Sequence, residues 1–315
     1  ADAIEAVSEE MDAPVAACLM GGDRTREPKQ QLQARGIPCY FDPARGIESL
    51  ATLARYRDIK EREYAEPMSF DVDRERAREI LETVRDRDDN RLGVEAMELL
   101  DAYGISTPAG EIVDTPERAA EVAADIDGDV VMKIVSPDIL HKSDIGGVAV
   151  GVGDDDVADT YEDLITRARN YQPDATVLGV QVQEMVDLDD GVETIVGMNR
   201  DPQFGPLLMF GLGGIFVEVM EDTTFRVAPV SEPEAREMTE EIQSAPLLRG
   251  ARGRDPVDVD AVVETIGRLS QLVTDFPAIL ELDINPLVAL PDADGDTNAA
   301  AVDVRLTVDP EELDP

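Results

Sequence analysis

The stretch from Val131 to Gly151 restricts the fold of this chain more than any other. It begins with an apolar run of strand length that carries Lys133. Ser136-Pro137 ends that run, because the residue before a proline is pushed away from the helical conformation. Gly146 and Gly147 then open a second apolar run. The pattern predicts two strands joined by a loop with exposed backbone N–H groups beside a lysine, an arrangement that suits phosphate.

The same loop carries His141, the only histidine among 315 residues, next to Lys142. Taken alone, a single histidine is as often a surface or core residue without a chemical role. The two neighbouring lysines favour a chemical role here, because a neutral imidazole is nucleophilic near pH 7 and can carry a phosphoryl group. Lys142 would disfavour the charged imidazolium. Either Asp144 or Asp283 could hold the second ring nitrogen, and the sequence does not choose between them.

Acidic residues dominate the charge: 69 Asp and Glu face 28 Lys and Arg, which gives a net charge of −41. They are spread along the chain, so they repel one another unless ions screen them. This favours the salt-rich cytoplasm of a halophile over one acidic partner-binding surface. The charge argues against nucleic-acid binding, which needs basic patches, and no 18-residue apolar run indicates a membrane span.

The start of the chain and its two cysteines say little about the function. The acidic opening lacks the basic region of a signal peptide, and it does not begin with Met. We therefore expect a fragment or a processed part of a longer chain in the cytoplasm. Cys18 and Cys39 are too few for a metal cluster, and both are expected to be reduced and buried.

Hydrophobic patterns divide the chain into four parts. Residues 1–66 alternate helices with continuous apolar strands, which is typical of a parallel α/β sheet. Two strands are too few for a whole domain, so this is the C-terminal piece of one. Residues 67–88 are expected to be a linker and a charged helix, within a charged stretch that begins near residue 57. Residues 89–175 and 176–315 form two further subdomains, and the mixed strands, helices and hairpins of the second indicate an α+β arrangement.

Two glutamates lie in consecutive predicted strands. Glu184 is in Val177–Met185 and Glu193 is in Val192–Met198, and the turn between them predicts a hairpin. Carboxylates that face inward across a hairpin often contact the hydroxyl or amine groups of a ligand. The alternative is that both are solvated residues on the outer face.

A glycine- and proline-rich segment begins at Asn199. Such segments are usually loops, and its Gly-Leu-Gly-Gly end is a weak phosphate signal because no Walker lysine follows it. Arg200 is expected either to bind phosphate or to pair with Asp201.

Polar residues interrupt two apolar strands near the C-terminus. Asp283 and Asn285 alternate with Leu282 and Ile284, so both polar side chains are expected on one strand face. Asp303 is embedded in the apolar strand Ala299–Leu306, which is unusual for a core strand. If the two strands are neighbours, Asn285 and Asp303 can share one Mg²⁺, with phosphates and water completing its shell.

Several segments together resemble a known family. KIVSPDILHKSDIGGVAVGV, VQEMV, ETIVGMNRDPQFGPLLMFGLGGIFVEV and ELDINPLV resemble the ATP-grasp part of ADP-forming acyl-CoA synthetases, such as the ADP-forming acetate–CoA ligases. The resemblance covers roughly residues 72–315. Residues 1–66, with IPCYFDPARGIESLATLARYRD, resemble the end of the flavodoxin-like CoA-ligase region. It implies an ATP-grasp fold preceded by a partial flavodoxin-like parallel α/β segment.

The resemblance also implies a reaction: acyl-CoA, ADP and phosphate give a carboxylic acid, CoA and ATP. In the family the phosphoryl group passes from an acyl phosphate to a first histidine, then to a second, then to ADP. His141 matches the second histidine, and Asp283 resembles the acid that supports it. The remaining matches are nucleotide-binding residues, Lys133, Gly146, Gly147, Glu184 and Glu193, and Mg²⁺ ligands, Asn285 and Asp303.

The CoA-binding part, its acyl site and the first histidine are missing from this sequence. The chain is therefore expected to act as the nucleotide half, with a CoA-binding domain or subunit that supplies acyl-CoA or acyl phosphate, in an oligomeric enzyme. Eight residues from Lys133 to His141 would allow a swing of roughly 25 Å. The sequence does not indicate which acyl group the enzyme uses, or whether it prefers ADP to GDP.

Three other functions remain open. Another ATP-grasp carboxylate ligase would not need His141. A nucleotide-sensing module is possible, although no acetyltransferase pattern accompanies it. A salt-adapted scaffold without activity leaves Asp303 unexplained.

Overall fold

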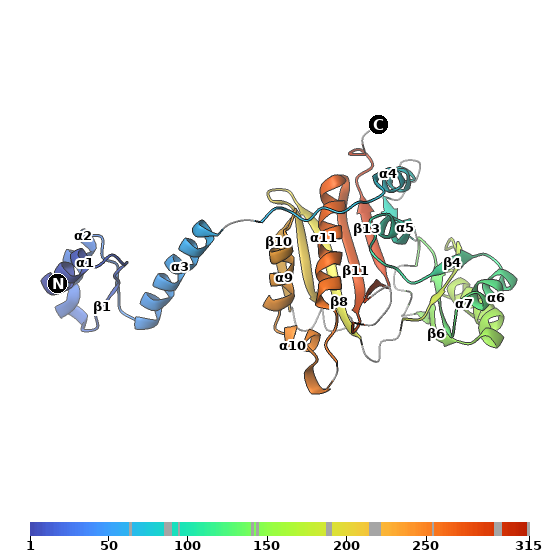
Figure 1. Cartoon of the computed structure of the whole chain (residues 1–315), viewed down its shortest axis with the longest axis horizontal. Helices are drawn as coiled ribbons and strands as arrows, with labels where there is room; N and C mark the ends of the chain where they lie inside the picture. Colours follow the sequence, from blue (N-terminus) through green and yellow to red (C-terminus); the bar gives the residue numbers. More distant parts are fainter. Residues whose placement is uncertain are drawn as a thin grey trace. The chain divides into compact units, whose positions relative to one another are not determined.

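A computed structural model describes most of the chain (Figure 1). The described residues are 1–62, 65–84, 90–93, 95–139, 142, 145–186, 191–213, 222–253, 255–292 and 298–313. His141 and Asp144 lie outside them. The chain forms two compact units, Ala1–Tyr64 and Ala65–Pro315. Within the described residues, no helix is long and apolar enough to cross a membrane.

The first unit is a small α/β piece. Its two strands pair in parallel, Ala17 opposite Cys39, which confirms the parallel arrangement predicted for this segment. Both cysteines are free; Cys39 is buried as expected, but Cys18 is exposed. Its elements are α1 (Asp2–Glu10), β1 (Ala17–Cys18), η1 (Gly22–Thr25), α2 (Arg26–Ala34), β2 (Cys39–Tyr40) and α3 (Pro43–Glu61).

The last helix of this unit is longer than its apolar pattern indicates. Asp42 caps α3 by accepting a hydrogen bond from the amide of Ala44 at 3.0 Å, and a proline occupies the first turn. The helix continues to Glu61. It therefore includes the first residues of the charged stretch expected to be a linker from residue 57, because a charged sequence without Gly or Pro does not end a helix.

The second unit contains a large antiparallel sheet, which we call the large-lobe sheet. Its strand order is β10-β9-β8-β11-β13-β3, and β12 pairs with β11. The strands are β3 (Arg91–Leu92), β8 (Val192–Asp201), β9 (Gly205–Leu212), β10 (Thr223–Val227), β11 (Ile279–Ala289), β12 (Ala299–Ala301) and β13 (Val304–Val308). The helices of this lobe are α4 (Arg74–Glu82), α5 (Glu95–Ala102), α9 (Glu232–Glu241), α10 (Ala245–Leu248) and α11 (Val259–Asp275), with η5 (Ala251–Gly253).

Strand alternation gives this sheet one buried face. Leu282 and Ile284 of β11 enter the main core with the helices, whereas Asp283 between them lies on the other face. Figure 1 shows α9 and α11 lying against one face of the large-lobe sheet. The polar residues expected from the sequence therefore lie on the face that these helices leave free.

Arg200 stabilises the end of α11. Its guanidinium donates to the carbonyl oxygens of Ile279 at 2.9 Å and Val273 at 2.8 Å. These are carbonyls at and beyond the helix C-terminus, where a cation is favourable. The expectation that Arg200 binds phosphate or pairs with Asp201 is wrong, because its donors are used by the backbone.

The second unit also contains a four-stranded antiparallel sheet, which with its helices forms the small lobe. Its strand order is β4-β7-β5-β6. One face packs against two helices in a separate core. The elements are β4 (Gly110–Val113), α6 (Pro116–Ala124), β5 (Val130–Val135), β6 (Val148–Val152), η3 (Asp154–Asp156), α7 (Val157–Tyr171) and β7 (Gly179–Glu184).

The predicted hairpin between residues 177 and 198 is wrong. β7 lies between β4 and β5 in the small lobe, whereas β8 lies between β9 and β11 in the large-lobe sheet. Val180 and Val182 belong to the small core, which holds β7 away from β8. The small lobe thus reaches Glu184, beyond the boundary expected between residues 175 and 176. Alternation predicts a strand but not its partner.

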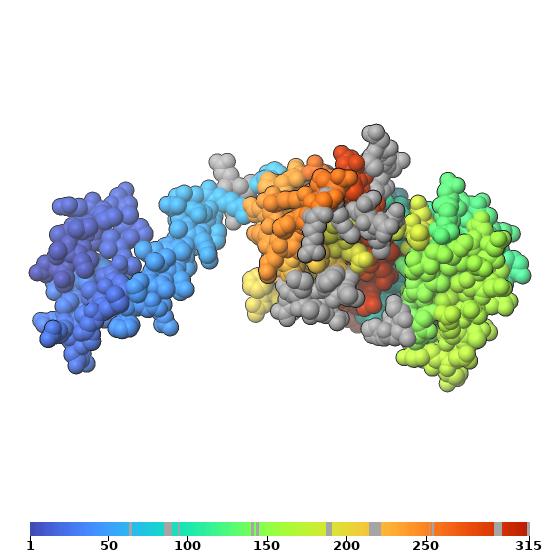
Figure 2. Space-filling model, turned by 90° about the horizontal axis from the view of Figure 1, so that it is seen from below, coloured from blue at the N-terminus to red at the C-terminus, as the bar shows by residue number. Residues whose placement is uncertain are grey.

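Two contacts fix the chain where it enters the small lobe. The amide of Ala301 donates to the carbonyl of Ser106 at 2.8 Å, and that of Glu184 donates to Ala109 at 2.7 Å. Figure 2 shows the β11–β13 region, in red, at the surface beside the small lobe, in green. The free face of the small-lobe sheet is thereby held near the strands that carry the polar residues.

Candidate functional site

Lys133 joins the two lobes. Its neighbours Met132 and Ile134 enter the small core, so strand alternation directs Lys133 to the opposite face. The side chain is buried, and Nζ donates to the carbonyl oxygen of Val302 at 3.1 Å. Burial lowers the pKa of Lys133, the Asp303 carboxylate raises it, and the Lys142 ammonium lowers it. A buried ammonium with a second cation nearby attracts an anion strongly.

Asp303 lies at a break rather than inside a strand. The expected strand Ala299–Leu306 is interrupted at Val302 and Asp303, which lie between β12 and β13. The amide of Asn285 donates to the carbonyl of Asp303 at 3.1 Å. The backbones of the two predicted ligands are therefore neighbours, and a shared metal ion stays a prediction. The break also leaves Asp303 half-buried, so a core strand does not have to bury its charge.

The donor set suits Mg²⁺ if phosphate completes it. Among the described residues, no three His, Cys, Asp or Glu side chains are grouped so as to hold a metal ion. The carboxylate of Asp303 and the amide oxygen of Asn285 are hard oxygen donors. Mg²⁺ is commonly bound by one or two protein oxygens together with substrate phosphates and water. The two residues fit that pattern and not an all-protein cage.

Asp283 is held in an unfavourable environment. It pairs with Gly197 on one side and Arg305 on the other, and its Oδ1 is buried without a hydrogen-bond partner. Burial raises the pKa of Asp283; Arg305 lowers it, and Glu281 and Asp303 raise it. A Cβ at Gly197 would come within 3.4 Å of Oδ1, so glycine leaves room above the carboxylate. An added N–H donor would relieve the unpaired oxygen.

The two glutamates are not brought together. Glu184 pairs with Val130, which is buried in the small core, so alternation places Glu184 on the face opposite Lys133, and it is exposed. Glu193 is half-buried in β8, four residues before Gly197 and hence on the same face of the large-lobe sheet as Asp283. Of the pair, only Glu193 lies on a face with other site residues.

The glycine pair forms a closed turn. Gly146 has φ of +64°, which favours glycine, and the amide of Gly147 donates to the carbonyl of Lys142 at 2.8 Å. A Cβ at Gly147 would lie 2.9 Å from that oxygen. The Gly147 N–H expected to be exposed for phosphate is thus already paired within the loop.

The sequence interpretation missed two glutamines that lie on the same face of the small-lobe sheet as Lys133. Gln181 and Gln183 of β7 alternate with Val180 and Val182 of the core, so they lie on the same face as Lys133. Gln183 is 1% exposed, and its Oε1 has no hydrogen-bond partner. The Val-Gln-Val-Gln alternation did not identify them, because a polar residue that alternates with valine usually faces water.

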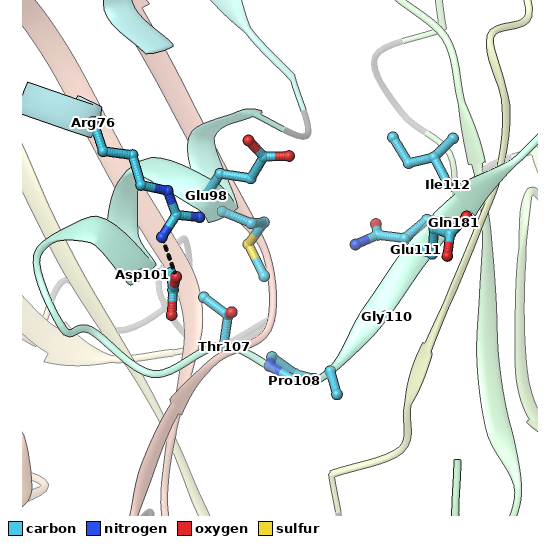
Figure 3. A pocket seen from close by; sticks show the side chains of 11 residues that line it. Arg76, Glu98, Asp101, Thr107, Pro108, Gly110, Glu111, Ile112 and Gln181 are labelled. Carbon is cyan, nitrogen blue, oxygen red and sulfur yellow. Dashed lines mark hydrogen bonds and ion pairs between the residues drawn. The ribbon is translucent and has the colours of Figure 1, made fainter. Parts of the chain in front are cut away.

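A cavity of about 530 Å³ opens beside these strands (Figure 3). Its volume is in the range of small-ligand sites. Gln181, in its wall, pairs with Lys133 in the next strand, and neighbouring strands lie about 4.8 Å apart. In Figure 3 the α4–α5 side and the β4–β7 side face each other across the cavity, and Arg76 pairs with Asp101 at 2.7 Å. The lining residues are Arg76, Met97, Glu98, Asp101, Thr107, Pro108, Ala109, Gly110, Glu111, Ile112 and Gln181.

Comparison with known proteins gives one matching family model and close relatives. The family model described as "ATP-grasp domain" matches residues 82–308. The chain is 45% identical over 232 residues to the acetate–CoA ligase [ADP-forming] I subunit beta of Pyrococcus furiosus, covering 73% of this chain and 97% of that one. It is 40% identical over 292 residues to acetate–CoA ligase [ADP-forming] I of Archaeoglobus fulgidus. That alignment covers 92% of this chain but only 42% of the A. fulgidus protein.

Solved structures of one relative match the same part. They are of the dinucleotide-forming acetyl-coenzyme A synthetase 1 of Ca. Korarchaeum cryptofilum. One holds coenzyme A, acetyl-coenzyme A and a phosphorylated phosphohistidine segment in "site I orientation" (35% identity, TM-score 0.67, covering 74% of this chain and 99% of that chain). Another holds coenzyme A and Mg-AMPPCP with the phosphohistidine segment pointing towards the nucleotide-binding site (35% identity, TM-score 0.64, same coverage).

Proposed function

Since this chain belongs to the ATP-grasp family and, within it, to the ADP-forming acyl-CoA synthetases, we propose that it is the nucleotide-binding and phosphoryl-transferring half of such an enzyme. The complete reaction would convert acyl-CoA, ADP and phosphate to a carboxylic acid, CoA and ATP. The chain spans 42% of the A. fulgidus relative, so the complete activity requires a CoA-binding domain or subunit that supplies the acyl phosphate.

The observation that carries this proposal is the position of Lys133. Its buried ammonium lies between the two lobes, bonded to a single carbonyl of Val302 and near Asp303 and Lys142. We infer that the phosphates of ADP or ATP bind there. The base would enter the cavity lined by Gln181, one strand from the lysine.

The acidic side of the site would hold the metal ion. Asp303, which is near Lys133, and its backbone neighbour Asn285 would supply hard oxygens. Bound Mg²⁺ would supply neutralisation of phosphate charge. Glu193, on the same sheet face as Asp283, would contact the nucleotide. Glu184 would contribute through the end of β7 rather than through the Lys133 face.

We propose His141 as the phosphoryl carrier. Its neutral nitrogen would attack the terminal phosphorus of ATP; the N–P bond forms, the bond to the ADP oxygen breaks, and ADP leaves. Asp283, with its buried unpaired oxygen, would accept the N–H of the other ring nitrogen and stabilise the charge of the phosphoimidazole. The phosphohistidine segment named in the structures of the Korarchaeum relative supports this role.

A labelling experiment tests the proposal. The protein, with Mg²⁺ and γ-labelled ATP in concentrated KCl, should acquire acid-labile, base-stable label at His141, and His141→Asn should acquire none. Arg169→Ala is the control, since it changes an exposed residue of α7 that has no role in the proposed site. Bound ATP without label in the wild type would refute the carrier role. Persistent full turnover of His141→Asn with its partner would favour another ATP-grasp carboxylate ligase instead.

A further inference from the structure

The free face of the large-lobe sheet continues past the site residues to the edge strand β10. Figure 1 shows β10 on the side of the sheet away from the small lobe. Arg226 of β10 bonds Glu241 of α9 at 2.6 Å, which places Arg226 on the helix-covered face. Because side chains alternate along a strand, Phe225 and Val227 point to the free face. They are 48% and 47% exposed, so both are accessible to solvent.

Strand register arranges the free face in two rows that cross the sheet. Each row begins with two apolar residues, on β10 and β9, and continues into the site strands β8 and β11. The first row is Phe225, Met209, Gly197 and Asp283. The second row is Val227, Leu207, Asn199 and Glu281. We call the residues Phe225, Val227, Leu207 and Met209 the apolar corner.

The apolar corner reaches Asp283 without an intervening side chain. In the first row only Gly197 separates Met209 from Asp283. A Cβ at Gly197 would lie 3.4 Å from Oδ1 of Asp283 and 3.5 Å from Cε of Met209. The methyl end of Met209 and the carboxylate thus approach the same glycine from the two neighbouring strands. A molecule that lies on the apolar corner therefore also borders Asp283.

Such a corner is an unusual surface for this chain. The sequence has 69 acidic residues and a net charge of −41, yet the corner itself carries no charge. Residues directly opposite each other in neighbouring strands have Cβ atoms about 5 Å apart, so the four side chains lie next to one another. Single exposed apolar residues need no explanation, whereas a contiguous group with a polar rim is typical of an interaction surface.

Charge and position select one partner for this surface. A second copy of this chain would bring a second net charge of −41 against it, and the two would repel wherever salt does not screen them. Under the proposed function, the CoA-binding half exchanges a phosphoryl group with the site beside Asp283, so it has to border the open side of that site. The chain spans 42% of the A. fulgidus relative, so more than half of that protein lies outside the matched part and can supply such a surface.

We propose that the apolar corner is a docking surface for the CoA-binding half of the enzyme. The surface that it meets would present large apolar side chains to Phe225 and Val227 and basic side chains towards Glu281. Docking there puts the partner beside Asp283 and leaves the cavity between the α4–α5 and β4–β7 sides uncovered. The inference rests on the proposed function and goes beyond it by naming the surface and the chemistry of its partner.

Cysteine modification tests the surface directly. Val227→Cys is made together with Cys18→Ser, because Cys18 is the exposed native thiol and Cys39 is buried. The matched control is Val150→Cys, since Val150 is a 67% exposed valine in β6 of the small lobe. The rate of maleimide modification is measured with and without the remaining part of the same enzyme, produced as a separate chain. That part should slow modification of Val227→Cys about ten-fold or more, because interface cores exclude solvent, and should not affect Val150→Cys.

Two threonine variants test the contribution to binding. Phe225→Thr and Val227→Thr remove the apolar contact but keep a residue that suits a strand, and Val150→Thr is the control. Phe225→Thr should weaken association with the CoA-binding half about 10- to 100-fold, the effect of truncating an aromatic anchor. The rate of His141 labelling by ATP and the Kd for ADP should not change, because neither residue lines the nucleotide cavity. A purely structural role would instead lower the melting temperature and the ADP affinity together.

The outcomes separate this inference from the proposed function. If the wild type is never labelled at His141 but Val227→Cys is protected by the partner, the docking surface stands and the carrier role fails. Equal modification of Val227→Cys with and without the partner overturns the docking surface, whatever the labelling shows. Protection that rises with the concentration of this chain alone assigns the corner to a second copy and overturns the partner named here.

Discussion

Replacing Asp283 by Asn should stabilise the protein at neutral pH while stopping phosphoryl transfer. Its Oδ1 is buried and unpaired, and burial and the neighbouring Glu281 and Asp303 raise its pKa while Arg305 lowers it. A buried group without a partner costs about 1–3 kcal/mol, and more when charged. Asparagine leaves the buried atom unpaired, so the variant removes only the additional cost of the charge. Losing the attraction of exposed Arg305 offsets roughly 0.2–1 kcal/mol of the gain. We expect a net stabilisation of about 1 kcal/mol.

The pH dependence follows from the direction of the shift. Because burial raises the folded pKa of Asp283 above its ordinary value, the folded state holds this proton more tightly than the unfolded state. The contribution of the group to stability is full below the unfolded pKa and is lost as the pH rises through the folded pKa. The advantage of Asp283→Asn should therefore exist at pH 7 and shrink as the pH falls towards that of the unfolded carboxyl.

Thermal unfolding in concentrated KCl measures this difference, with wild type and variant compared at each pH so that the other carboxylates cancel. A gain of about 1 kcal/mol corresponds to roughly 2–4 °C in a unit of this size. Arg305→Gln is the matched control, since it should destabilise slightly and retain His141 labelling. A less stable Asp283→Asn at pH 7 would refute the reasoning, because Asp283 would then be a stabilising residue and not a strained functional one.

Three further predictions concern the lysine, the helix cap and the charge. Lys133→Met should weaken ADP binding about 10- to 100-fold by calorimetry, the effect of a lost charge-assisted hydrogen bond, with little change in melting temperature; unchanged affinity would place the phosphates elsewhere. Arg200→Ala should cost about 2–3 kcal/mol of stability in urea, because carbonyls of Val273 and Ile279 lose their donor, and it should leave the ADP affinity intact. Raising KCl from about 0.1 to about 1 M shortens the Debye length from about 10 to about 3 Å, so a net charge of −41 predicts a higher melting temperature; a constant or lower one would contradict a salt-adapted surface.

Strand and helix positions were predictable where the periodicity was regular. α9 spans Glu232–Glu241, a stretch whose capping box and amphipathic pattern are local signals. The mixed α/β architecture and the ATP-grasp fold expected from the motifs are confirmed. The pairing of β7 with β4 and β5 was not predictable, since the turn between residues 187 and 191 resembles a hairpin and alternation does not identify partners.

The candidate site residues could be chosen from the sequence, but their geometry could not. The sequence left open whether Asn285 and Asp303 are neighbours; their backbones are, and the break that frees Asp303 from the strand is a tertiary feature. Gln183 was overlooked because a polar residue alternating with valine usually faces water. The opposite is true here, since the second lobe covers that face, and no local pattern reports a second lobe.

The small lobe comes from one continuous segment of the chain. All four of its strands, with Lys133 and the histidine loop, come from one uninterrupted stretch of chain, Gly110–Glu184, whereas Asn285 and Asp303 are encoded outside it. One continuous segment thus carries the cationic residues of the proposed site, and the sequence after it carries Asn285 and the acidic residue Asp303. We expect that a chain cut between residues 187 and 190 would give two fragments, neither of which binds a magnesium nucleotide alone. Recovery of ADP binding on mixing would then report the reassociation of the fragments, in which β3, α4 and α5 of the first rejoin the large-lobe core.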